Sequence, residues 1–148
     1  KKPTGENPMY FKDANEFQDV LGAFLAKIMD DPKIGNAFAS TNALVKVAFS
    51  DPDAVMWLDC RKPTPAVWSE TSESQVTEEP DMVLTMTADN GHRFWLGRLS
   101  LPIALANRKV KVKGSTAMLM KLLPVLKPVY RGYEQFLIEQ GRDDLVAV

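Results

Sequence analysis

A stripe of apolar residues marks the first element of the chain. Residues Phe17, Val20, Leu21, Phe24, Leu25 and Ile28 recur at the spacing of a helix that buries one face. Asp13 followed by Glu16 is typical of a capped helix start, and Asp30, Asp31 and Pro32 predict its end. Pro32 then opens a short second helix, which has Asp31 as its cap.

The period of the pattern changes in the middle of the chain. Val45, Val47 and Phe49 alternate with less apolar residues, which predicts a strand. Further strands are predicted at 54–61, from Ala66 through Trp68 into the polar residues 69–74, and at 82–87. Short turns separate the first three strands, so these favour an antiparallel meander.

Helical signals return after residue 87. A helix is predicted with Thr87 or Asp89 as its cap and an end near Gly97, followed by a short helix from Pro102 with Asn107 as its left-handed stop. A strand at 109–113 and a final helical region capped by Ser115 complete the predicted elements. Pro124 is expected to kink that region, Pro128 to start another helix and Gly141 to end it. The order predicts one mixed α and β domain at 13–148 after an N-terminal extension at 1–12, with one sheet covered by helices.

Composition narrows the function classes. The 148 residues carry a formal net charge of −1, so a general nucleic-acid binder, which needs a basic excess, is not expected. One cysteine and one histidine exclude a disulfide framework and any site that needs two of either residue. The acidic residues show no metal-ligand spacing, so no metal or cofactor is predicted. No signal peptide or membrane span is visible, and a cytoplasmic location is expected.

The few residues that could carry chemistry also have simpler interpretations. His92, near Asp89, is a candidate general base, but an exposed residue in the first turns of a helix is the favoured interpretation. Cys60 lies in an apolar strand and is expected to be a buried structural residue. Lys109, Lys111 and Lys113 form the solvated face of a strand or, alternatively, attract anionic lipid headgroups. No catalytic residue is predicted.

Apolar surface is the strongest remaining signal. Met82, Leu84 and Met86 share one strand face, and residues 117–126 are almost wholly apolar. A helix that is apolar nearly all round must be covered on several sides. This surface is either core or the wall of a ligand cavity, and methionine suits both because its flexible side chain adapts to varied neighbours.

Four segments together resemble the sterol carrier protein 2 family, in particular its bacterial stand-alone members. These are residues 81–89, 94–98, 103–114 and 122–128. The resemblance implies a five-stranded, mostly antiparallel sheet with helices packed on it, enclosing an apolar tunnel. Asn107 stands where the family commonly has glycine, and Asn tolerates the same left-handed turn. The C-terminal residues are not a peroxisomal address, which fits a bacterial cytoplasmic protein.

The resemblance implies non-enzymatic binding, and transfer inside the cell, of a fatty acyl chain, a sterol or a similar lipid. The candidate ligand-binding residues are Trp57, Met82, Leu84, Met86, Phe94, Trp95, Leu101, Leu105, Met118, Leu122, Leu123, Leu126 and Tyr130. The alternative is an accessory or assembly module of a lipid, steroid or quinone metabolic complex, which acts as a homodimer or with an enzyme partner. Transient contact with an anionic membrane is also expected, whereas a nucleic-acid partner is not. An enzyme that uses His92 is the third hypothesis.

Overall fold

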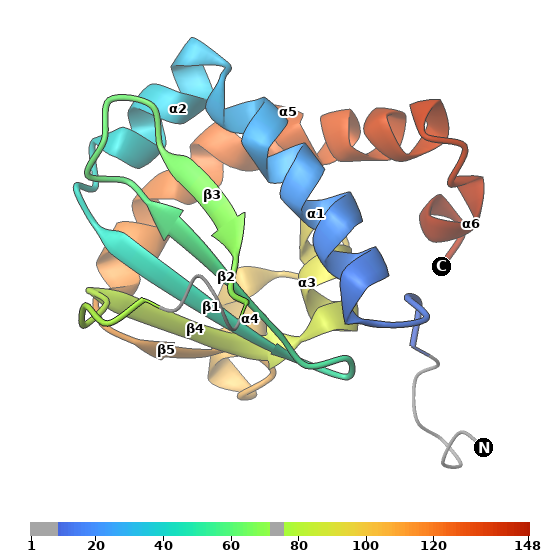
Figure 1. The fold of residues 1–148 in the computed structure, drawn as a ribbon, viewed down its shortest axis with the longest axis horizontal. Coiled ribbons are helices and arrows are strands. Elements are labelled where there is room, and N and C mark those ends of the chain that lie inside the picture. Colours follow the sequence, from blue (N-terminus) through green and yellow to red (C-terminus); the bar gives the residue numbers. More distant parts are fainter. Residues whose placement is uncertain (1–8, 72–75) are drawn as a thin grey trace.

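One five-stranded sheet organises the fold of the computed structural model, which describes residues 9–71 and 76–148 (Figure 1). The strands are β1 (Leu44–Ser50), β2 (Ala54–Asp59), β3 (Ala66–Ser69), β4 (Met82–Thr87) and β5 (Lys111–Lys113), in the spatial order β3-β2-β1-β4-β5. The predicted polar continuation of the third strand reaches residues 72–74, outside the described residues, as do residues 1–8 of the predicted extension.

Three of the four strand pairs are antiparallel. The pairs β1–β2 and β2–β3 form the predicted meander, and β4 pairs with β5 in the same sense. The exception is β1–β4, which is parallel because the chain returns from the β3 edge to the other side of β1. The predicted α+β fold with a five-stranded, mostly antiparallel sheet is therefore confirmed.

The structure describes six helices, and all but the last begin directly after a side-chain cap. They are α1 (Ala14–Met29), α2 (Pro32–Ala39), α3 (Ala88–Trp95), α4 (Leu101–Ala106), α5 (Thr116–Glu139) and α6 (Asp143–Val146). The side chains of Asp13, Asp31, Thr87, Ser100 and Ser115 each accept a hydrogen bond from a backbone N–H in the first turn of the helix that follows. Helix α1 packs on β2 and β3, whereas α3 packs on β1 and β4.

Two local expectations were wrong. Helix α5 continues through Pro124 and Pro128, so Pro128 does not start a new helix. Pro128 lacks the N–H that would pair with the Pro124 carbonyl, but both prolines are exposed, so water can reach that carbonyl. Asn107 ends α4 at φ −98°, and the left-handed residue is its neighbour Arg108 at φ 66°. Helix α6 was not predicted.

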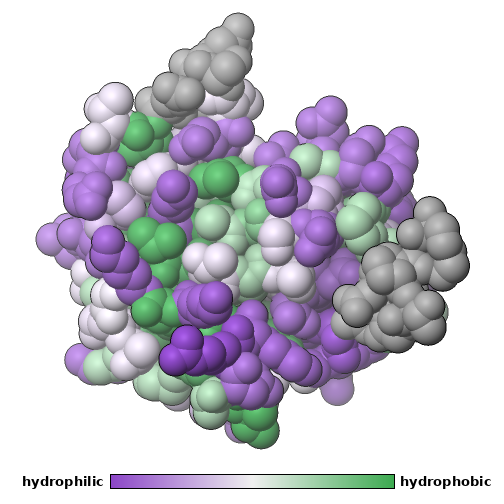
Figure 2. Space-filling view, turned by 90° about the horizontal axis from the view of Figure 1, so that it is seen from below, coloured by the Kyte–Doolittle hydropathy of each residue, from purple (hydrophilic) through white to green (hydrophobic). Residues whose placement is uncertain are grey.

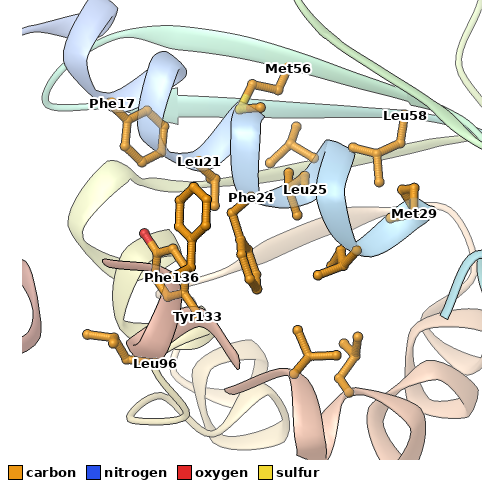
Figure 3. Packing of buried hydrophobic residues seen from close by; sticks show 14 of the residues in the cluster. Phe17, Leu21, Phe24, Leu25, Met29, Met56, Leu58, Leu96, Tyr133 and Phe136 are labelled. Carbon is orange, nitrogen blue, oxygen red and sulfur yellow. The ribbon is translucent and has the colours of Figure 1, made fainter. Parts of the chain in front are cut away.

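The main core lies between the sheet and the long C-terminal helix. Phe17, Leu21 and Phe24 of α1 form its centre, with Met56 and Leu58 of β2 on one side, and Tyr133 and Phe136 of α5 on the other (Figure 3). Phe24 contacts both α5 rings, with centroid distances of 4.7 Å to Tyr133 and 5.5 Å to Phe136. Helix α1 therefore joins the sheet to α5.

Candidate functional site

A cavity of about 120 Å³ lies between the sheet and the helices. Strands β1, β2 and β4 form one wall, and helices α1 to α5 contribute the others. The lining residues are Leu25, Phe38, Thr41, Val45, Val47, Phe49, Leu58, Cys60, Met82, Leu84, Met86, Gly91, Phe94, Trp95, Leu99, Leu101, Val110, Met118, Leu119, Leu122, Leu123 and Leu126. Nearly all of these side chains are apolar, so the cavity suits a hydrocarbon guest.

Strand alternation builds the sheet wall of the cavity. Side chains at every second position point to one face, and directly paired residues share that face. Val45 pairs with Leu58 and Met82, and Val47 pairs with Leu84. The same face carries Phe49 beside Met86, which places rows of apolar side chains from three strands under the helices.

Ten of the thirteen candidate ligand-binding residues meet at this cavity. They are Met82, Leu84, Met86, Phe94, Trp95, Leu101, Met118, Leu122, Leu123 and Leu126. Trp57, Leu105 and Tyr130 do not line it. The role of the whole set in ligand binding stays a prediction, as does the tunnel.

Trp57 lies on the opposite face of the sheet. It pairs with Lys46 and with Trp68, and its neighbours Met56 and Leu58 point the other way. Its indole N–H donates to Glu70 Oε1 at 2.8 Å, and its ring stacks on Trp68 at a centroid distance of 6.4 Å. Trp57 is only 2% exposed, so these contacts give it a structural place away from the cavity.

A groove of about 620 Å³ runs along α4 and α5 beside the cavity. It is lined by Gly97, Leu99, Ser100, Leu101, Pro102, Met120, Leu123, Pro124, Lys127 and Tyr130. Leu99, Leu101 and Leu123 line both the groove and the cavity, so these side chains lie between the two spaces. Leu105 instead packs against the small apolar cluster of Leu101, Ala104 and Val110.

The lysine and tyrosine of this groove give it a polarity that the cavity lacks. Lys127 is exposed, and Tyr130 is half-buried with a pKa raised by burial. Lys127 is a cation and the Tyr130 hydroxyl is a hydrogen-bond donor and acceptor. An amphipathic molecule could therefore place its apolar part in the cavity and its polar end in the groove.

Cys60 is a buried cavity residue with little reactivity. Its side chain is 1% exposed, as the sequence predicted, and burial raises the pKa of its thiol to about 11. A thiol with this pKa is almost entirely protonated near neutral pH, whereas the thiolate is the nucleophile. Cys60 therefore contributes packing to the wall.

His92 is buried, which contradicts its interpretation as an exposed residue. Its Nε2 contacts the Leu145 carbonyl oxygen at 2.7 Å and its Nδ1 contacts the Tyr133 hydroxyl at 2.8 Å. The rings of Tyr10 and Phe11 pack edge-on against it. Burial lowers the pKa of His92 to about 4, so the ring is neutral near pH 7. His92 does not line the cavity but ties α3 to α5 and to α6.

Metal-binding clusters and membrane-spanning helices are both absent from the part of the chain that the structure describes. Within residues 9–71 and 76–148, no group of three or more His, Cys, Asp or Glu side chains is placed to hold a metal ion. None of the helices in these same ranges is long and apolar enough to cross a membrane.

The sequence interpretation missed part of the wall. Val45, Val47 and Phe49 of β1 line the cavity, and their alternation had already predicted a strand with one apolar face. That alternation was the available signal. Leu25 belongs to the predicted apolar stripe, and Phe38 lies on the buried face of α2. No local pattern separates a core residue from a cavity residue there.

Comparison with known proteins gives one family and a consistent fold. A profile of the SCP-2 sterol transfer family matches residues 21–127. No curated protein matches the chain significantly.

Solved structures with this fold share little sequence with the chain. Sterol carrier protein 2 from Yarrowia lipolytica, in its apo form, has a TM-score of 0.57 and 17% identity, covering 79% of this chain and 91% of its own. The ubiquinone synthesis protein UbiJ-SCP2 has a TM-score of 0.54 and 12% identity, covering 84% and 96%. Sterol carrier protein 2 from Aedes aegypti in complex with palmitate has a TM-score of 0.52 and 16% identity, covering 76% and 96%.

Proposed function

The chain belongs to the SCP-2 sterol transfer family, and on that premise we propose that it binds a lipid without catalysing a reaction and transfers it inside the cell. The ligand class is a fatty acyl chain, a sterol or a similar apolar molecule. The observation that carries this proposal is the cavity under the helices, whose wall is almost wholly apolar and includes three methionines, Met82, Met86 and Met118.

Removal of hydrocarbon surface from water drives the binding. Each Å² of apolar surface transferred into such a cavity stabilises the complex by roughly 25 cal/mol. The wall offers no charged side chain that would oppose this transfer. The Aedes aegypti structure with palmitate supports the acyl-chain class, since that protein has the same fold.

The size of the cavity adds a requirement. A cavity of about 120 Å³ is on the scale of the roughly 150 Å³ space that accepts benzene, whereas sites for larger ligands span roughly 300–1,000 Å³. A long lipid therefore needs the cavity and the groove to join. Leu99, Leu101 and Leu123 form the shared wall, and a rotation of the half-buried Leu123 would open it.

Displacement of a fluorescent probe tests the proposal. The purified protein is loaded with a fluorescent fatty acid or sterol, and unlabelled lipids of each class are titrated against it. We expect displacement by at least one class and a matching lipid adduct in native mass spectrometry. No displacement by any class, together with no adduct, would exclude the proposal. Mass spectrometry of the lipid extracted from the purified protein would identify the ligand.

The small cavity also favours a second candidate function. The chain would then act as an accessory or assembly module of a lipid, steroid or quinone metabolic complex, with little ligand transfer. The fold shared with a ubiquinone synthesis protein supports this candidate. Light scattering after size exclusion and a pull-down from native lysate distinguish the two. A monodisperse monomer without stable partners counts against the module. The cytoplasmic location stays a prediction.

A further inference from the structure

Charge is distributed very unevenly along this nearly neutral chain. Residues 90–133 contain nine lysines and arginines and no aspartate or glutamate. The rest of the chain contains the other nine basic residues and all nineteen acidic ones. The basic segment supplies most of α3, all of α4 and β5, and the first three quarters of α5. This segment forms much of the cavity wall and the whole lining of the groove.

Six of these cations lie on or beside the elements that build one small apolar cluster; Lys111 and Lys113 pair with Thr85 and Val83, so they lie on the face of the edge strand β5 opposite Val112. Leu101 and Ala104 of α4 pack with Val110, just before β5, against Met120 and Leu123 of α5. The exposed side chains on these elements include Arg108, Lys109, Lys111, Lys113, Lys121 and Lys127, which we call the basic rim. No member of the basic rim forms an ion pair with any residue in the described ranges.

An exposed apolar residue lies on α4, the helix that supplies part of this cluster. Ile103 on α4 is 64% exposed, the largest exposure among the large hydrophobic side chains that the structure describes. Its neighbour Pro102 lines the groove. Helix α4 and β5 lie together on the lower side of the molecule in Figure 1. Figure 2 views this side and shows hydrophilic side chains interspersed with hydrophobic ones.

We propose that this side, formed by the basic rim and Ile103, docks on an anionic lipid bilayer with the groove facing the membrane. Cations attract the headgroups of acidic lipids, and an exposed aliphatic side chain gains by entering the headgroup boundary. The lipid then passes through the groove past Leu123 into the cavity without crossing bulk water. This inference rests on the proposed lipid-binding function.

The apolar features favour a bilayer over other polyanions. An RNA or an acidic protein would also be attracted to the basic rim, since Coulomb attraction does not distinguish these partners. Neither would explain an exposed isoleucine beside a groove that leads to an apolar cavity. A bilayer uses both features, because it presents anionic headgroups above hydrocarbon.

Vesicle flotation tests the proposal with the full chain. We expect binding to vesicles of phosphatidylcholine and phosphatidylserine in equal parts, little binding to phosphatidylcholine alone, and weakening by salt. The combined variant Lys109→Glu, Lys111→Glu and Lys113→Glu should bind at least on the order of a hundredfold more weakly, since each cation near the surface changes partitioning about fivefold. Ile103→Ser should also weaken binding, by several-fold.

Matched variants control for net charge and for apolar exposure. Lys12→Glu, Lys33→Glu and Lys62→Glu together change the charge equally at exposed sites outside the basic segment. Ile138→Ser removes an isoleucine that is 50% exposed on α5. Both controls should bind vesicles like the parent. If the first triple variant does not fold, Arg108→Glu with Lys121→Glu makes the same comparison.

Three results would overturn the proposal. The first is equal vesicle binding by the test and control triple variants, and the second is no binding to the anionic vesicles. The third is tighter binding to a single-stranded oligonucleotide than to the vesicles, with an oligonucleotide affinity that Ile103→Ser does not change. Probe displacement in lipid-free solution reports the cavity separately. A failure of docking with intact probe binding would therefore remove only this inference. Docking without probe binding would remove the proposed function and the passage of lipid, and would leave only the membrane contact.

Discussion

The Tyr133 hydroxyl donates a hydrogen bond to Nδ1 of His92 across 2.8 Å of buried interior. The other ring nitrogen fixes this direction. Nε2 lies 2.7 Å from the Leu145 carbonyl oxygen, which can only accept, so Nε2 carries the proton of the neutral ring. The bond therefore requires a neutral His92, and three helices meet at it: α3, α5 and α6.

This requirement predicts a loss of stability in mild acid. Burial lowers the pKa of His92 from 6.5 to about 4 in the folded chain, so between these values the unfolded chain binds the proton and the folded chain does not. The free energy of unfolding should be highest above pH 6.5 and fall by up to about 3 kcal/mol as the pH drops to 4. Urea unfolding at a series of pH values measures this slope.

His92→Phe supplies the control for that slope. It keeps an aromatic ring against Tyr10 and Phe11 but removes the titrating group. We expect lower stability at pH 7, by about 1–3 kcal/mol, because the Tyr133 hydroxyl and Leu145 carbonyl lose their partner. The fall between pH 6.5 and 4 should then largely disappear. An unchanged slope would assign the acid sensitivity to other groups.

Local signals predicted the elements, and long-range packing decided what the sequence did not show. Asp13, Asp31, Thr87 and Ser115 cap their helices through side chains that reach only a few residues along the chain, so each start was readable. The burial of His92 depends on Leu145, which is 53 residues away, and no local pattern encodes that contact.

The candidate site shows the same division. The alternation of Met82, Leu84 and Met86 predicted their common face, and the structure places all three at the cavity. Trp57 does not join them because it pairs with Lys46, which places its side chain on the opposite face of the sheet. A shift of the strand register by one residue would turn that side chain to the cavity face. Apolar character alone could not assign the face, because the neighbours Met56 and Leu58 are apolar as well.

Two glycines should respond oppositely to alanine. A Cβ at Gly35 would overlap the backbone carbonyl oxygen of Met29, so α2 packs against the end of α1 only with glycine there. Gly35→Ala should lower the free energy of unfolding by about 1–3 kcal/mol. Gly132 in α5 has nothing within 4 Å of its Cβ position, and Gly132→Ala should stabilise by about 0.5–1 kcal/mol. Denaturant titrations of the two variants measure these changes in the free energy of unfolding. Equal changes in the two variants would contradict the close packing of α2 against α1.

A charge at Leu123 should weaken lipid binding more than it destabilises the fold. Leu123 is half-buried and lines both the cavity and the groove, so an aspartate there places a carboxylate on the path of the ligand. We expect probe affinity to fall at least about tenfold in Leu123→Asp and to stay within about threefold in Leu123→Met. Ile138→Asp adds the same charge at an exposed site outside the cavity and groove. Equal affinity in a folded Leu123→Asp protein would remove Leu123 from the ligand path.

The three tryptophans should report ligand position directly. Trp95 lines the cavity, whereas Trp57 and Trp68 stack on each other across the opposite face of the sheet. An acyl chain that carries bromine quenches an indole only at short range, so such a ligand should quench Trp95 and spare the other two. The experiment titrates a brominated fatty acid into Trp95→Phe and into Trp57→Phe with Trp68→Phe. We expect quenching to be lost in the first variant and retained in the second, because the second removes no cavity residue. Quenching that persists without Trp95 would place the chain outside the cavity and would contradict the assignment of this wall to lipid.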